Sequence, residues 1–320
     1  MPSFPKNKLA APFPWAGGKV MQSDLVWSRF GKVTNYVEPF AGSLGVLLNR
    51  PAPFRGVETI NDADGFVVNF WRATKAAPLD VAAHADHPVT SVDLWARHDW
   101  LVTQRATLTA QLVEDPEWFD AKIAGWWAWG LCAWIGSGWC ADTSSAGTHR
   151  QRVHTGNAGM GLHSKTARQR VHTGDAAPGS GWLMDLHNRL RDVRILCGDW
   201  TQAVQSGVLR YGSCIAVYLD PPYAKEAKRH KDLYSVDSET VAHDVRAWAV
   251  ENGENPKMRI ALAGYEAEHD MPETWECVPW KLHGHGYAAQ GADTQGKRNV
   301  TRERVWFSPH CLRPEQRDLL

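Results

Sequence analysis

Short segments rich in β-branched and aromatic residues lie toward the two ends of this 320-residue chain, and they constrain its fold more than any other feature. Each is bounded by turn-forming residues, as expected of a short strand. Several lead into an acidic residue or a glycine, which is typical of strands that feed the functional loops of open α/β sheets. The predicted strands are residues 33–38, 57–64, 193–197, 214–219, 258–263, 275–282 and 303–307. They predict an α/β fold built from both ends of the chain.

The middle of the chain differs in composition from its ends. Residues 72–135 have Ala, Leu and Trp at mixed, helix-compatible spacings, interrupted by prolines. These prolines are Pro78, Pro88 and Pro116. Residues 136–181 lose all periodicity and are rich in Gly, Ser, Thr, His and Arg, a composition typical of functional or disordered loops. We therefore predict one domain from residues 1–72 and 190–320, with a segment inserted at 73–189.

Composition excludes several classes of protein. Lys+Arg and Asp+Glu are equal at 35 each, which excludes a uniformly basic protein but allows a local basic patch. The six cysteines form no CxxC pair, and the first residues lack a signal-peptide core, so we expect reduced thiols in a cytoplasmic protein. Cys132 and Cys140 match no standard zinc spacing, and no metal is predicted. The apolar run 124–141 is rich in Gly and Trp, so we expect a buried helix ending at 136–138 rather than a membrane span.

Residues 217–224 (VYLDPPYA) give the strongest indication of chemistry. An apolar strand ends at Asp220, and the consecutive Pro221 and Pro222 remove two N–H donors, so the backbone there presents only carbonyl acceptors. The ring of Tyr223 follows and can stack on a flat ligand. Acceptors beside a stacking ring suit the exocyclic amino group of a nucleobase. The alternative is a proline turn after a core strand, with Tyr223 as packing.

Two glycine-containing segments near the N-terminus predict a ligand loop. In residues 12–20 (PFPWAGGKV), Gly17 and Gly18 permit close approach of the backbone to a ligand, and Lys19 follows. The pattern of a phosphate-binding P-loop is absent. In residues 36–48 (YVEPFAGSLGVLL), a strand enters a glycine loop and we expect an apolar helix to follow, as in the cofactor loops of nucleotide-binding folds. Each segment alone is also compatible with an ordinary turn.

Acidic residues close two further predicted strands. Asp62 follows the second strand, where nucleotide-binding folds hold a ribose hydroxyl pair, and Glu58 and Asp64 are its rivals for this role. Asp199 closes another strand and can face the adenine of a cofactor. Each acid is also compatible with a solvated strand end.

Taken together and in this order, these segments resemble the Dam-like family of DNA adenine-N6 methyltransferases, which use S-adenosylmethionine. The resemblance covers about residues 12–71 and 190–308, in the W-x-G-G-K, E-P-F-x-G and D-P-P-Y motifs and the acidic second strand. The motifs are Trp15-Ala16-Gly17-Gly18-Lys19, Glu38-Pro39-Phe40-Ala41-Gly42 and Asp220-Pro221-Pro222-Tyr223. The chain departs from the family at Pro12, where a Phe is frequent, and at Leu44, where a second Gly is frequent; Gly45 comes just after.

The resemblance implies a Rossmann-like S-adenosylmethionine-dependent methyltransferase sheet with helices on both faces, and an inserted target-recognition segment of helices and loops. It implies that Asp220 and the Pro221 carbonyl bind adenine N6, that Pro222 completes the motif and that Tyr223 stacks on the flipped-out base. It implies a monomer acting on double-stranded DNA. The cofactor contacts that it implies are Trp15, Gly17, Gly18, Lys19, Glu38, Pro39, Phe40, Gly42, Asp62, Asp199 and Asp220.

The heptapeptide RQRVHTG occurs twice, at residues 150–156 and 168–174, in a basic loop at about 142–181. No acidic residue stands between Asp142 and Asp175. We expect this loop, and a basic run after the D-P-P-Y motif, to contact DNA phosphates, with some Arg side chains reading guanine edges. The predicted DNA contacts are Arg150, Arg152, Lys165, Arg168, Arg170, Lys225, Lys228, Arg229 and Lys231. The alternative is a pair of solvated loops without a role.

Other functions remain open at this point. Methylation of cytosine N4 is the nearest, although related enzymes of that type usually carry Ser before the two prolines, where this chain has Asp220. A non-catalytic DNA-binding protein on the same scaffold is a second alternative. Methylation of RNA or protein is a third, although relatives that act on glutamine usually carry Asn at that position.

Overall fold

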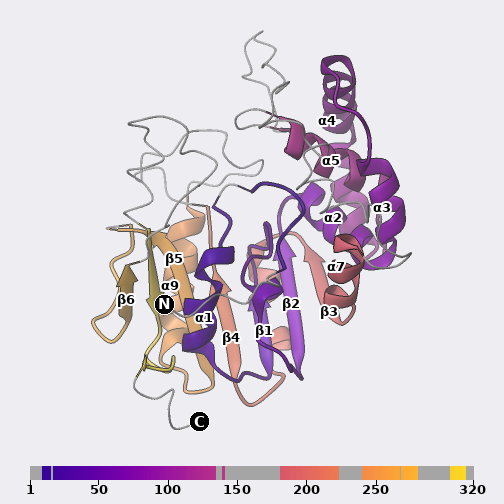
Figure 1. Cartoon of the computed structure of the whole chain (residues 1–320). Coiled ribbons are helices and arrows are strands. Elements are labelled where there is room, and N and C mark those ends of the chain that lie inside the picture. Colours follow the sequence, from indigo (N-terminus) through magenta and orange to yellow (C-terminus); the bar gives the residue numbers. More distant parts are fainter. Residues whose placement is uncertain are drawn as a thin grey trace, which may run out of the picture. The chain divides into compact units, whose positions relative to one another are not determined.

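The structure, a computed structural model, describes residues 9–15, 17–134, 139–140, 181–222, 240–266, 268–279 and 303–314 (Figure 1). The chain divides into two compact units. The helical unit holds the described residues of Met1–Trp15 and Asp62–Asp199. The sheet unit holds the described residues of Ala16–Asn61, Trp200–His230 and Asp237–Leu320.

Seven strands form one mixed sheet in the order β3-β2-β1-β4-β5-β7-β6. Strand β1 pairs in parallel with β2 and β4, and β4 with β5, whereas β7 is antiparallel to both β5 and β6. The strands are β1 Asn35–Glu38, β2 Val57–Asp62, β3 Val193–Cys197, β4 Ile215–Leu219, β5 Met258–Tyr265, β6 Glu276–Pro279 and β7 Glu303–Phe307. All seven fall on predicted strand segments, and the α/β class is confirmed.

The strand order creates a topological switch point between β1 and β4. From β1 the chain proceeds outward to β2 and β3, and β4 then lies on the opposite side of β1. Ligands of open α/β sheets bind outside the carboxyl ends of the strands at such a point. The register pairs Val37 of β1 with Val217 of β4, so Glu38 and Asp220 lie at the carboxyl ends of neighbouring strands.

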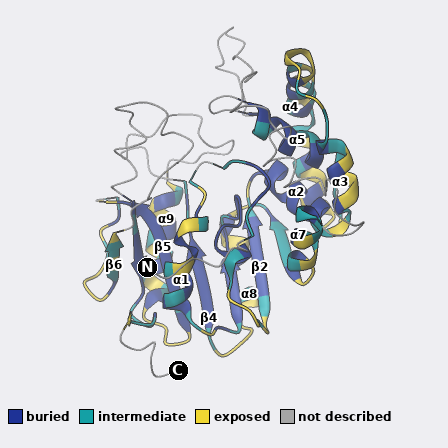
Figure 2. Ribbon diagram, in the orientation of Figure 1, coloured by how far each residue is buried: buried dark blue, intermediate teal, exposed yellow. Residues whose placement is uncertain are grey.

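Both strands at the switch point are interior strands. Every residue of β1 and β4 is buried (Figure 2), as expected of parallel strands that are covered on both faces. Helices α1 and α9 both contact β5, and Figure 1 shows α1 in front of the sheet and α9 behind it. The helical elements of the sheet unit are η1 Val20–Gln22, α1 Ser23–Phe30, η2 Leu47–Asn49, η4 Trp200–Val204, α8 Ser206–Leu209 and α9 Val241–Gly253.

The prediction of an apolar helix after the glycine loop of residues 36–48 is wrong. Only the three-residue η2 follows β1 before the chain enters β2. Gly42 and Leu44 have positive φ angles of 44° and 54°, which turn the chain instead of continuing a helix. Arg50 is extended before Pro51, a position at which the α conformation is disfavoured.

The helical unit packs around aromatic side chains. Its helices are α2 Gly65–Ala76, α3 Pro78–Ala85, α4 Ser91–Glu114, α5 Ala121–Ala133 and α7 Trp182–Leu190. The Trp127 ring of α5 lies 5.0 Å from the Phe13 ring and 6.0 Å from the Phe70 ring of α2. Gly125 lets α5 approach α3, since a Cβ there would lie 2.5 Å from the Cβ of His84. The prediction of helices over 72–135 is confirmed.

Helix α5 occupies most of the apolar run of residues 124–141. It ends at Ala133, where Trp134 turns extended, so the predicted end at 136–138 is wrong by a few residues. Gly130 faces Trp139, whose ring would overlap any added Cβ. None of the helices in the described residues is long and apolar enough to cross a membrane.

His269 gives the sheet unit a testable pH dependence. Its side chain is buried against Trp306, with ring centroids 5.1 Å apart, and burial together with nearby Arg246 lowers its pKa to about 4. Because the unfolded chain binds this proton near pH 6.5, stability present above that pH is lost as the pH falls from 6.5 to 4, by about 3 kcal/mol. Urea unfolding of wild type and His269→Leu between pH 4 and 8 measures it. Equal pH slopes in the two proteins would contradict this expectation.

Candidate functional site

An ion pair lies at the switch point of the sheet unit. The ammonium Nζ of Lys19 is 3.0 Å from Oδ1 of Asp220, with the two side chains 5% and 19% exposed. Lys19 stands immediately before η1, and Asp220 immediately follows β4. The same ammonium donates a hydrogen bond to the Gly17 carbonyl at 2.7 Å. The structure thus brings together two motifs that are about 200 residues apart in the sequence.

Two opposing effects act on the pKa of the Asp220 carboxyl group. Burial raises the pKa of its carboxyl group, because a low-dielectric environment disfavours the charged form. The Lys19 ammonium opposes this effect through its charge and its hydrogen bond, both of which lower the pKa. Lys19 therefore favours the ionised form of Asp220.

A second carboxyl group, that of Glu38, is buried at the end of β1. Its Oε2 accepts hydrogen bonds from the Tyr36 hydroxyl at 2.8 Å and from the Leu47 N–H at 3.2 Å. Burial raises its pKa to about 8, with smaller contributions in the same direction from the charges of Asp220 and Glu58. Glu38 is therefore mainly protonated at neutral pH and links β1 to η2.

Three buried residues that the sequence analysis did not single out, Tyr218, Gln22 and Glu303, form a hydrogen-bonded chain near the ion pair. The Tyr218 hydroxyl of β4 donates to Gln22 Oε1 at 3.0 Å, and Gln22 Nε2 donates to Glu303 Oε2 of β7 at 3.3 Å. Burial raises the pKa of Glu303, Lys19 lowers it and Asp220 raises it. Gln22 and Glu303 are 281 positions apart, and no local pattern signals such a contact.

The glycine loop after β1 contacts the turn that carries Lys19. A Cβ on Gly45 would lie 2.6 Å from the Val20 nitrogen and 2.8 Å from the Lys19 carbonyl carbon. The residue before it, Leu44, is fully buried and holds a left-handed conformation at φ 54°, which costs about 1–2 kcal/mol relative to a glycine. The leucine at position 44 is thus accommodated with backbone strain, and Gly45 supplies the close approach.

Aromatic side chains follow the same strand end. Phe40 is half-buried, and its ring stacks on that of Trp200 with centroids 6.2 Å apart and an interplanar angle of 26°. Trp200 in turn meets Trp248 of α9 edge-on at 6.3 Å. Pro39 is buried, and its carbonyl accepts a hydrogen bond from the Asn61 side chain at 3.1 Å. These contacts fix the ring of Phe40 after β1.

The rivals of Asp62 have structural partners. Glu58 is buried in an ion pair with Arg50 at 3.2 Å. Asp64 caps α2 by accepting from the Phe66 N–H at 2.9 Å. Asp62 is the last residue of β2, half-buried, and accepts from the Asp64 N–H at 2.9 Å. Asp199, in the helical unit, is exposed.

The W-x-G-G-K motif of residues 15–19 is divided between the two units. Trp15 belongs to the helical unit, where its half-buried ring lies 6.1 Å from Trp127. Gly17 has a φ of 73°, a conformation that glycine adopts readily, and Gly18 is exposed. Pro221 is buried and Pro222 half-buried after Asp220.

Part of the predicted site lies outside the described residues. Those positions are Tyr223, Arg150, Arg152, Lys165, Arg168, Arg170, Lys225, Lys228, Arg229 and Lys231. Among the residues that are described, no group of His, Cys, Asp and Glu side chains could hold a metal ion.

Comparison with known proteins leaves the geometry as the main guide. No protein-family model matches the chain, and no curated protein matches it.

Proposed function

We propose that this chain is a site-specific DNA methyltransferase that transfers a methyl group from S-adenosylmethionine to N6 of an adenine flipped out of double-stranded DNA. The observation that carries the proposal is the place of Asp220. It is a half-buried acid paired with Lys19, it begins the D-P-P-Y motif, and it lies at the switch point where open α/β sheets bind ligands.

The chemistry assigned to the chain is that of an acceptor cluster. The Asp220 carboxylate and the Pro221 carbonyl accept hydrogen bonds from the two protons of the adenine amino group. These bonds favour a pyramidal nitrogen and orient its lone pair, so catalysis is by orientation and electrostatics. Pro221 and Pro222 have no N–H groups that could compete for the base's own acceptors. S-adenosylmethionine, when bound, supplies the electrophilic methyl group.

The residues around the switch point fit such a cofactor. Phe40 presents a half-buried ring held by Trp200, and the positive φ of Gly42 turns the backbone after it. At the end of β2, Asp62 is half-buried and its Oδ1 accepts a hydrogen bond from the Asp64 N–H at 2.9 Å. The residues proposed to hold the cofactor are Trp15, Gly17, Gly18, Lys19, Glu38, Pro39, Phe40, Gly42, Asp62, Asp199 and Asp220.

DNA binding is assigned to the basic segments of the sequence. Extrusion of the adenine costs a few kcal/mol, which phosphate contacts by Lys and Arg offset. Replacing residues 147–176, which contain both RQRVHTG copies, by a short Gly/Ser linker should weaken DNA binding and flatten its dependence on salt. Fluorescence anisotropy with a labelled duplex across a salt series measures both. Unchanged affinity and salt slope would remove this segment from the proposal.

Transfer of labelled methyl groups from S-adenosylmethionine to duplex DNA tests the proposed reaction. Nucleoside digestion and mass spectrometry then identify the methylated base, and N6-methyladenine is expected. N4-methylcytosine as the sole product would select the cytosine enzyme. DNA binding without any methylated base would select the non-catalytic DNA-binding protein.

A further inference from the structure

The ammonium group of Lys19 is buried, which is unfavourable for a charged group. Its side chain is only 5% exposed, and the ammonium contacts Oδ1 of Asp220 at 3.0 Å and the Gly17 carbonyl at 2.7 Å. Removing either member of a buried ion pair leaves an uncompensated charge. The position of the Lys19 backbone therefore decides whether Asp220 has a counter-ion.

Gln22 fixes that backbone from one side. Its N–H donates to the Lys19 carbonyl at 2.9 Å and closes η1. Its side-chain amide is held at both ends, by the Tyr218 hydroxyl at 3.0 Å and by Glu303 at 3.3 Å. Strands β4 and β7 thus hold the turn that carries Lys19, and Glu303 supplies the acceptor for the Gln22 NH₂ group.

Gly45 limits the same backbone from another side. The loop after β1 packs directly on the peptide of Lys19 and Val20, at distances that leave no room for a Cβ. A displacement of the turn in this direction would collide with the loop. The position of Lys19 is therefore determined by contacts from β4, β7 and the glycine loop.

We propose that Lys19 and Glu303 are positioning residues of the reaction centre: Lys19 keeps the Asp220 carboxylate charged, and Glu303, through Gln22, holds the turn that carries Lys19. The inference rests on the proposed function, which makes Asp220 the hydrogen-bond acceptor of the substrate amine. Among the described residues, the ionisable groups that act on this centre are Lys19, Glu38 of β1 and Glu303 of β7. Only Lys19 among these three groups is cationic, so its loss has no substitute there.

The titration of Asp220 tests the role of Lys19 without any assay of activity. Carboxyl-¹³C aspartate is incorporated into the full chain, and the Asp220 signal is the one that Asp220→Asn removes. In Lys19→Met the midpoint of this signal should rise by about one to three pH units, because a counter-ion within contact distance is lost. Lys257→Met, at an exposed lysine of the same unit, should leave it unchanged. An unchanged midpoint in Lys19→Met would overturn the proposal.

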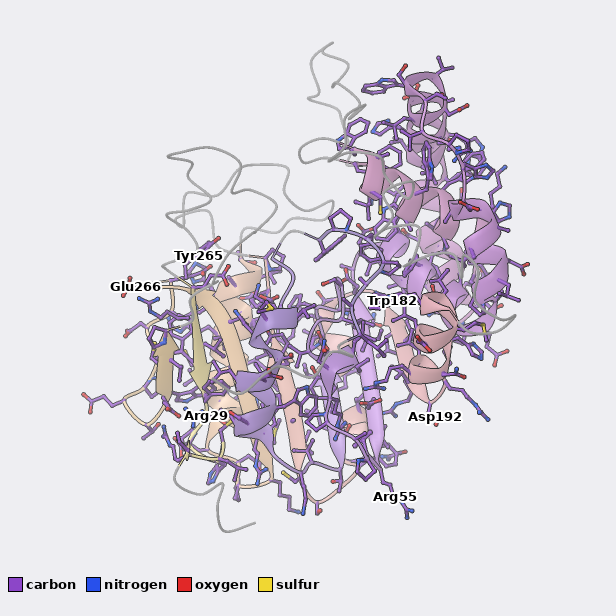
Figure 3. All side chains as sticks on the ribbon, viewed as in Figure 1. Arg29, Arg55, Trp182, Asp192, Tyr265 and Glu266 are labelled. Atoms are coloured by element: carbon purple, nitrogen blue, oxygen red, sulfur yellow. The ribbon has the colours of Figure 1, made fainter. Side chains whose placement is uncertain are left out.

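Two variants of Glu303 separate anchoring from charge. Glu303→Gln keeps an acceptor for Gln22 and removes the carboxyl group, whereas Glu303→Leu has a similar volume and no acceptor. Glu303→Leu loses the hydrogen bond to Gln22, so the midpoint of the Asp220 titration should rise. Glu303→Gln keeps this hydrogen bond, so its Asp220 midpoint should be equal to or lower than that of wild type. Equal Asp220 titration midpoints in Glu303→Gln and Glu303→Leu would contradict a positioning role for Glu303. Glu266→Gln is the matched control, because Glu266 lies at the end of β5 with its side chain on the surface (Figure 3).

Gly45→Ala provides a test that retains every charge. The added methyl group displaces the Lys19 turn, so the Asp220 midpoint should rise although Lys19 is present, and this variant replaces Lys19→Met if the latter does not fold. If the enzyme is active, the acid limb of its pH profile of kcat/KM should move to higher pH in Gly45→Ala and in Lys19→Met. If wild type transfers no methyl group, the proposed function fails, while the carboxyl titration still supports or overturns the Lys19–Glu303 arrangement.

Discussion

Asp220→Asn is expected to reduce methyl transfer to DNA by about 100-fold or more, with DNA affinity unchanged. The amide is the same size as the carboxylate and can still accept from Lys19, which lies 3.0 Å away in wild type. It lacks the negative charge that strengthens the hydrogen bond to the substrate amine. Initial rates with labelled S-adenosylmethionine and anisotropy with a duplex measure the two quantities separately.

Controls must separate this loss from unfolding. Asp270→Asn makes the same chemical change at an exposed aspartate of the same unit and should retain wild-type rates. Thermal unfolding of Asp220→Asn shows whether the fold survives, since the buried Lys19 loses a charged partner. Full activity in a folded Asp220→Asn protein would contradict the assignment of Asp220 as the acceptor.

At pH 4.5, Glu38→Ala is expected to destabilise the sheet unit by about 2–5 kcal/mol, whereas Glu38→Gln should be close to neutral. Alanine leaves the buried Tyr36 hydroxyl and the Leu47 N–H without the acceptor that both use. Glutamine supplies that acceptor, and wild-type Glu38 is itself mainly protonated at this pH. Urea unfolding of the three proteins gives the two differences in free energy.

The same pair of variants also predicts a pH dependence. The pKa of Glu38 is about 8 in the folded protein and near 4.5 when unfolded, so the folded state binds more protons between these values. Stability present below pH 4.5 is thus lost as the pH rises to 8, and Glu38→Gln should be more stable than wild type at pH 8.5 by about 4 kcal/mol. The difference between variant and wild type isolates this effect from that of His269, which has the opposite sign. A difference that does not change with pH would contradict a protonated Glu38.

The fold was largely predictable because its signals are local. Each strand is a short apolar segment bounded by turn residues, and the helical middle is divided at prolines, including Pro78 at the first position of α3. The missing helix after β1 was not predictable in this way. Whether Gly42 and Leu44 take positive φ angles depends on what packs against the loop, and a leucine gives no local warning of it.

The candidate site was predictable only in part. Lys19, Glu38 and Asp220 each belong to a short motif, but the contact between Lys19 and Asp220 was not predicted and became visible only in the structure. Glu303 and Gln22 belong to no motif, because their role arises from contact across 281 positions. Likewise, only the structure shows that Asp64 caps α2 and that Glu58 forms an ion pair with Arg50.

The sequence alone therefore determined the elements and the acids that close them, since backbone propensity and the spacing of apolar residues act over a few residues. The tertiary structure decided the electrostatic environment of each of these acids. Burial raises the pKa of Glu38, Asp220 and Glu303 alike, and only the packing of η1 against β4, β7 and the glycine loop sets the Lys19 ammonium beside Asp220. The energy of a buried charge depends on neighbours within a few ångströms, and those neighbours come from distant parts of the chain.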